Sequence, residues 1–236
     1  MKVKVSAGVF SSWLRRCRYM LLADTGMDVP CGDCRACCTS SKFVTVRPDE
    51  KVTLSRIPEK YLFRAPLQPG GNLVMGYDEN GHCPMFRENR CTIYHDRPAA
   101  CRNFDCRVFS AAGVQPDGKD AAICRQVNLW KFEYPCDSDR YLHKCVGDAA
   151  RFIKDKPHRF PGGRVPEDTV QIAISSIKAC TVFITEQNGP AIGQTDKAAA
   201  VRIVQAVREF DGMSSLLRQK KTAASGNVVY GLPHDP

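Results

Sequence analysis

The sequence predicts a helix-rich, irregular α+β protein, in which a metal-organised cysteine domain with short strands precedes a helical extension. Eight of the thirteen cysteines lie between residues 31 and 106, where short apolar runs alternate with turn signals rather than with long helical periods. Apolar residues recur at helical spacing only before and after this region. We therefore divide the chain into an N-terminal amphipathic helix and lead-in (1–30), a metal-binding domain (31–135), a helical C-terminal extension (136–218) and a loosely ordered polar tail (219–236).

The composition is that of an ordinary globular protein. The chain has 236 residues, of which 43% are hydrophobic and 25% are charged, and a chain of this length can bury a core without help from a metal. The longest apolar stretch, residues 171–184, contains two serines and a lysine, so we expect no membrane span. The first 22 residues lack the apolar region and cleavage site of a signal peptide, which favours a cytoplasmic protein with reduced thiols.

The positive charge does not by itself indicate a nucleic-acid partner. The formal net charge is +9, but residues 1–30, 31–106 and 107–236 carry +3, +2 and +4, so no segment concentrates the excess. A divalent metal held by four thiolates would also add a net charge of −2. We therefore expect nucleic acid to be an unlikely partner and leave open a protein partner that the sequence does not identify.

The first predicted element is a helix near the N-terminus. At a period of 3.6 residues, five apolar side chains share one stripe while the neighbouring arginines face elsewhere: Phe10, Trp13, Leu14, Cys17 and Leu21. This stripe predicts a helix docked on the core with Cys17 as a buried thiol. A helix of this kind can alternatively lie on a membrane surface or act as a targeting segment.

Several short elements are predicted within the cysteine-dense region. Residues 42–46 are typical of a strand, and Pro48-Asp49-Glu50 indicates the start of a helix carrying Val52, Leu54 and Ile57. Residues 72–77 predict a second strand that enters a hairpin turn at residues 78–81. Asp96 is predicted to cap a short helix that has Pro98 in its first turn, Cys101 within it and Cys106 just beyond its end.

Three helical stripes follow in the C-terminal part. Breaker-rich loops at residues 157–163 and 189–190 separate them. The stripes consist of Tyr141, Cys145, Ala149 and Phe152; then Val170, Ala173, Ile174, Ile177 and Ile184; then Ala200, Ile203, Val204, Val207 and Phe210. We expect this unit to act as a scaffold.

The cysteine spacing is the strongest chemical signal. A CxxCxxCC motif places four cysteines within eight residues, and two-residue gaps let successive thiolates face one point, as in zinc knuckles and bacterial ferredoxin loops. The adjacent side chains of Cys37 and Cys38 tend to diverge, so one of them can serve a second site. A second group follows with Cys83-Pro84, Cys91, Cys101 and Cys106.

This string of motifs resembles the YkgJ-like cysteine-cluster family, the CxxCxxCC zinc- or iron-chelating domain. The family pattern of CxxCxxCC, then CP, then CxIYxxRPxxCRxF and a final cysteine is present without a gap, and the resemblance extends from Cys31 to about Pro135. The resemblance implies that the metal ligands are Cys31, Cys34, Cys37, Cys38, Cys83, Cys91, Cys101 and Cys106.

Three functions remain open at this point. The first is a redox or structural metal-binding module with an iron–sulfur cluster, favoured as [4Fe–4S], or with Zn²⁺ as the alternative. The second follows from flagellin lysine N-methylases, which are similar in cysteine pattern and imply an iron–sulfur cluster with S-adenosylmethionine. Against it, the chain has neither a GxGxxG-like turn after a strand nor a CxxxCxxC motif, so whether the protein is an enzyme stays open. The third is a zinc-stabilised adaptor or nucleic-acid-binding module.

Other residues near or outside the signature are spare candidates. Arg97 and Arg102 have donors and charge that suit thiolate sulfur, with a solvated surface role as the alternative. Cys145 and Cys180 are expected in the core. Spare metal ligands are His82 and His95, and an additional site could be built from Cys124, Cys136, His143 and Cys145.

Overall fold

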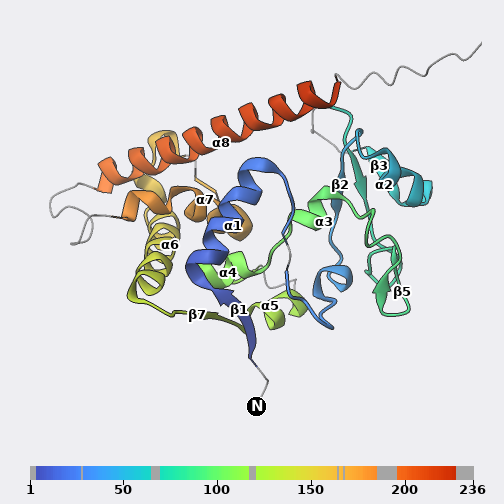
Figure 1. Cartoon of the computed structure of the whole chain (residues 1–236), viewed down its shortest axis with the longest axis horizontal. Coiled ribbons are helices and arrows are strands. Elements are labelled where there is room, and N and C mark those ends of the chain that lie inside the picture. Colours follow the sequence, from blue (N-terminus) through green and yellow to red (C-terminus); the bar gives the residue numbers. More distant parts are fainter. Residues whose placement is uncertain are drawn as a thin grey trace, which may run out of the picture.

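The computed structural model describes residues 4–27, 29–64, 70–116, 121–163, 165–166, 168–184 and 196–226. Figure 1 shows a helical part under the long C-terminal helix and, beside it, a part built of short strands and short helices. The α+β prediction is confirmed, with much more helix than strand. None of the helices in the described ranges is long and apolar enough to cross a membrane.

The helical part surrounds the main core. It contains α1 (Phe10–Ala23), α4 (Arg107–Ala112), α5 (Ala121–Val127), α6 (Asp137–Asp155), α7 (Thr169–Ala179) and α8 (Asp196–Gly226), with short 3₁₀ turns η3 (Pro157–Arg159), η4 (Pro161–Gly163) and η5 (Cys180–Phe183). The predicted stripe of α1 is buried at Phe10, Trp13, Leu14 and Cys17, while Leu21 is partly buried. Burying these side chains removes apolar surface from water and fixes α1 against α6, α7 and α8.

The other predicted helical stripes also form helices, with local exceptions. Ala149, Ile177 and Phe210 are buried, whereas Tyr141 and Ile184 are exposed. Ile184 lies beyond the end of α7, so it does not continue that helical stripe. Helix α8 continues to Gly226, past residue 218, where we expected the helical extension to end, and residues 227–236 lie outside the described ranges.

A parallel strand pair that we did not predict ties the N-terminus to the middle of the chain. β1 (Val5–Val9) pairs with β7 (Trp130–Glu133), with Val5 opposite Trp130. β1 leads directly into α1, and β7 precedes α6. This pairing brings the entrances of both helices together beside α4 and α5 (Figure 1).

The cysteine region has its own small sheets. β2 (Val44–Val46), β4 (Leu73–Met75) and β3 (Leu62–Arg64) form an antiparallel sheet in that order, and β5 (Phe86–Arg87) pairs with β6 (Arg90–Cys91). The short helices are η1 (Ala36–Thr39), α2 (Lys51–Arg56), η2 (Glu59–Tyr61) and α3 (Ala99–Asn103). A small separate core of five buried residues holds these elements: Val46, Ile57, Met75, Met85 and Ile93.

Two local predictions in this region are wrong. The turn at residues 78–81 does not close a hairpin, because the preceding strand β4 pairs with β2 and β3. Asp96 does not cap α3; the side chain of Glu50 accepts the backbone N–H of Ala99 at 2.6 Å instead. The helix predicted after Pro48 forms as α2, and the side chain of Val52 on it is 58% exposed.

Candidate metal centre

The first four cysteines lie on a tight loop that leads into a 3₁₀ turn. The backbone N–H of Cys34 donates to the carbonyl oxygen of Cys31 at 2.8 Å, and Gly32 allows the turn by adopting a φ of +52°. Cys37 and Cys38 lie within η1. The guanidinium of Arg35 holds this loop by donating to the carbonyl oxygens of Gly32, Cys34 and Asn89 at 2.7–2.9 Å.

The second group of cysteines meets the first through a backbone contact. The N–H of Cys83 donates to the carbonyl oxygen of Cys38 at 2.8 Å, across 45 residues of sequence. Cys91 lies on β6 opposite Phe86, which follows Cys83 by three residues. Cys101 lies within α3, and Cys106 precedes the first residue of α4. The two cysteine groups are therefore brought together by the fold.

The thiols are close enough to disfavour one another's ionisation. Burial is the main cause of the raised pKa values, which reach about 11 for Cys31 and about 12 for Cys38, Cys101 and Cys106. Neighbouring signature cysteines raise all four values further. The pKa values of Cys37 and Cys83 are also raised, mainly by desolvation, although part of the Cys37 side chain is exposed. A cation at this position would reverse that balance by favouring thiolates.

Positive and hydrogen-bonding groups lie around the thiols. The charge of Arg97 lowers the pKa of Cys101 against the larger effect of burial, and its guanidinium stacks over the ring of Tyr94 at 4.0 Å. Arg102 instead donates to the carbonyl oxygen of Arg97 and pairs with Glu50, so it supports the local backbone. The indole Nε1–H of Trp130 donates to the sulfur of Cys106 at 3.1 Å.

A buried ion pair fixes the end of this region to the helical core. The carboxylate of Asp105 accepts hydrogen bonds from the guanidinium of Arg107 at 2.8–3.1 Å and from the indole of Trp13 at 2.9 Å. Arg107 also reaches the carbonyl oxygen of Ala7 on β1. Cys106 lies between these two charged residues in the sequence, so the ion pair fixes the backbone on both sides of it. Sequence reasoning missed this pair and Trp130, because no motif marks their contacts.

The signature thiols stand near one another without a preformed metal geometry. All thirteen cysteines are free thiols, so no disulfide joins the two groups. Within the described ranges, no three or more His, Cys, Asp or Glu side chains stand in an arrangement that could hold a metal ion. Soft sulfur donors suit zinc or iron, but ligation would require the sulfur atoms to move closer together.

The spare candidates have other contacts. His82 packs edge-on against Phe86, and His95 against Tyr94, at ring distances of 5.9 and 5.8 Å. The thiols of Cys145 and Cys180, both buried as expected, donate to the carbonyl oxygens of Phe183 and Ile177.

The residues considered for an additional site lie on α5 and on or directly before α6, and each has another contact. Cys124 lies on α5 and donates to the carbonyl oxygen of Pro116, while the Cys136 thiol donates to Asp139 at the start of α6. The ring of His143 stacks on that of Phe10, with a centroid distance of 4.3 Å. These contacts describe packing and capping roles.

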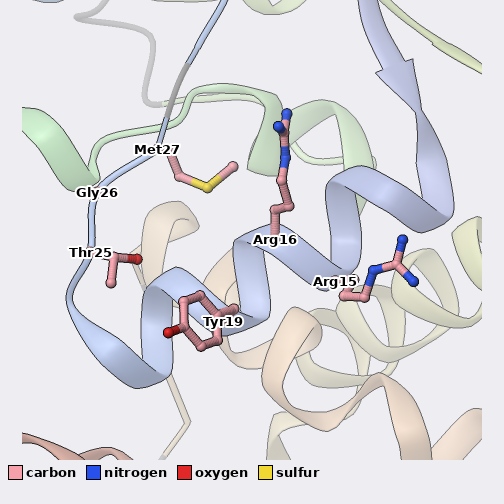
Figure 2. Close-up of a pocket in the computed structure, with 6 residues that line it drawn as sticks. All are labelled: Arg15, Arg16, Tyr19, Thr25, Gly26 and Met27. Atoms are coloured by element: carbon pink, nitrogen blue, oxygen red, sulfur yellow. The ribbon is translucent and has the colours of Figure 1, made fainter.

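A surface cavity of about 520 Å³ lies beside the cysteine region, between α1 and residues 25–27. Figure 2 shows the side chains of Arg15, Arg16 and Tyr19 projecting from α1, with Met27 on the facing segment. The backbone N–H of Met27 donates to the carbonyl oxygen of Arg102, which fixes that segment beside α3. No cysteine lines this cavity, so it is separate from the thiols.

Comparison with known protein families accounts for the cysteine pattern. One family model matches residues 30–126, and its description reads "CxxCxxCC: Putative zinc- or iron-chelating domain". This segment is similar to the CxxCxxCC domain. The match contains all eight signature cysteines, the α3 and α4 helices and the Asp105–Arg107 pair of this chain. No curated protein and no solved structure matches the chain. The family description of the CxxCxxCC domain is thus chelation of zinc or iron, without a cluster type.

Proposed function

We propose that the CxxCxxCC domain binds iron–sulfur, with the four cysteine ligands that a cluster requires drawn from Cys31, Cys34, Cys37, Cys38, Cys83, Cys91, Cys101 and Cys106. The observation that carries this proposal is the convergence of two distant cysteine groups. The hydrogen bond from the Cys83 N–H to the Cys38 carbonyl oxygen joins the groups, and each group raises thiol pKa values in the other. Partly buried thiols gathered in this way become strong ligands for iron and zinc when they ionise to thiolates.

The loop chemistry favours iron–sulfur over zinc. The repeated two-residue gap and the Cys83-Pro84 dipeptide are typical of ferredoxin loops, which favours [4Fe–4S]. Hydrogen bonds to ligand sulfur tune cluster potentials, and the Trp130 indole already donates to Cys106. If cysteines fill every coordination position, no open position remains for a substrate, so a redox or structural role follows.

The test is anaerobic purification followed by metal analysis and absorption spectroscopy. We expect iron and acid-labile sulfide in equal amounts and a broad visible absorption band that dithionite bleaches. A colourless protein that holds stoichiometric zinc would contradict the iron–sulfur assignment and support a zinc-stabilised scaffold. A protein with neither metal after reconstitution would contradict chelation itself.

Cysteine variants test the ligand assignment separately. Cys34→Ser and Cys101→Ser should lower metal content and solubility together, because metal binding is coupled to folding. Cys180→Ser is the matched control, since this thiol is buried against Ile177 in the helical core. Wild-type metal content in both the Cys34 and Cys101 variants would show that the ligands are elsewhere.

A further inference from the structure

We propose that the eight cysteines form two separate four-thiolate metal sites. The first site consists of Cys31, Cys34, Cys37 and Cys106, and the second consists of Cys38, Cys83, Cys91 and Cys101. This inference rests on the proposed function and adds to it the division of the ligands and the number of metal centres.

The division begins at the two adjacent cysteines. Cys37 and Cys38 are neighbours in η1, a 3₁₀ turn. A 3₁₀ helix has about three residues per turn, so consecutive side chains point roughly 120° apart. The two sulfur atoms therefore face different sides of the turn and are poorly placed to bind the same mononuclear ion. One cysteine for each of two sites satisfies this geometry.

The first site gathers on the side of the main core. The turn that links the Cys34 N–H to the Cys31 carbonyl oxygen brings these two cysteines together. Cys106 comes from the start of α4, between the ion-paired Asp105 and Arg107 in the sequence, and its sulfur accepts a hydrogen bond from Trp130. The charge interactions are consistent with this grouping: Cys37 and Cys34 raise the pKa of Cys31, and Cys37 and Cys31 raise the pKa of Cys106.

The second site gathers on the side of the small core. The Cys83 N–H donates to Cys38, and the β5–β6 pairing places Cys91 next to the segment that carries Cys83. Cys83 and Cys91 both pack against the small core around Met85 and Ile93. Cys101 comes from α3, and the charges of Cys83, Cys37 and Cys91 act on it. Cys37 thus lies nearest the boundary, so the two sites are adjacent.

Arg97 is the arginine that could balance charge at the second site. It precedes Cys101 by four residues, and its guanidinium lies over the ring of Tyr94. A divalent ion with four thiolates carries a net charge of −2. Two such centres side by side would repel each other, and Arg97 would offset part of that repulsion, whereas Arg107 is already paired with Asp105.

The test counts metal ions on the intact chain, with zinc as the probe because it accepts four thiolates regardless of the natural metal. The reduced full-length protein would be saturated with Zn²⁺ and measured by native mass spectrometry. We expect two zinc ions per chain. One zinc ion per chain would overturn the division but leave chelation intact, whereas no bound zinc would contradict the proposed function as well.

Single variants then assign the ligands to the sites. Cys31→Ser and Cys91→Ser should each retain one zinc ion, and the double variant should retain none. In the Cys31 variant, the partly exposed Cys34 should become reactive to iodoacetamide while Cys83 stays protected; in the Cys91 variant this pattern should reverse. Loss of both ions from either soluble single variant would overturn the division. If a variant does not fold, the wild-type zinc count still decides the number of sites.

Discussion

The buried ion pair between Asp105 and Arg107 gives the sharpest test of how the cysteine region is joined to the helical core. The side chains of Asp105 and Arg107 are 0% and 2% exposed and meet at 2.8 Å. Taking either partner away leaves a charge in the core without its counter-ion. Such a change typically costs about 3–5 kcal/mol, because the remaining charge keeps its desolvation penalty and loses its attraction.

We therefore expect Arg107→Met to lower the free energy of unfolding by about 3–5 kcal/mol. Methionine keeps much of the length of the arginine side chain, so the loss reports mainly on the charge. Asp105→Asn should cost a similar amount, since the amide cannot neutralise Arg107. The double variant should cost less than the sum of the two single variants by roughly 1–3 kcal/mol, because it leaves no unpaired charge.

Urea unfolding followed by circular dichroism measures all three values under one set of conditions. The matched control is Arg56→Met, which removes an exposed partner of Asp96 at a distance of 3.6 Å. That pair is solvated, so its loss should cost less than about 1 kcal/mol. Single-variant costs at the control's level, or strict additivity in the double variant, would refute the reasoning.

Three further predictions concern the helical part. Burial lowers the pKa of His143, so below the ordinary pKa of 6.5 the unfolded chain binds more protons than the folded one. The free energy of unfolding should therefore fall as the pH drops from 7.5 to 5.5. Urea unfolding should show a smaller fall in His143→Phe, which lacks the titrating ring. Asp139 accepts hydrogen bonds at the starts of α1 and α6, and these bonds lower its pKa to about 2. Asp139→Asn should therefore lower the Tm at neutral pH, whereas Asp137→Asn, at an exposed position, should not. The difference in Tm between the wild type and Asp139→Asn should vanish as the pH falls from about 4 through about 2, because the Asp139 carboxylate becomes protonated. Ile177→Ala should lower the free energy of unfolding by about 2–5 kcal/mol by opening a cavity, while the exposed Ile184→Ala should change it little; equal effects would show that Ile177 is not a core residue.

Local patterns predicted what depends on local geometry. The stripe through Phe10, Trp13 and Cys17 predicted α1, because helical periodicity and core burial follow from spacing alone. The pairing of β1 with β7 could not be predicted in this way, since its partners lie more than 120 residues apart. The predicted cap of α3 was wrong for the same reason. Asp96 has the spacing of a capping residue, but Glu50, from a distant segment, accepts the hydrogen bond from the backbone N–H of Ala99.

The same distinction applies to the metal centre. The eight candidate cysteines were implied by the resemblance to the cysteine-cluster family, and the family match covers all of them. Their grouping was not, because it depends on where β5, β6 and α3 place Cys83, Cys91 and Cys101 relative to η1. The supporting contacts of Trp130 and Arg107 come from segments without a metal-binding motif, so only three-dimensional contacts show them.

The distribution of apolar burial explains why a metal would matter most to residues 31–101. Among the described residues, their own core has five buried side chains, their strands have two or three residues each, and Phe43 and Phe63 are 64% and 52% exposed. So little buried apolar area can offset only part of the conformational entropy lost on ordering. Cys106, by contrast, is buried against the main core and is held by Trp130. It can therefore serve as the fixed ligand toward which metal binding would draw the loop that carries Cys31, Cys34 and Cys37. Because Cys37 and Cys38 are adjacent in η1, fixing Cys37 in the first proposed site would also restrict the position of Cys38 in the second.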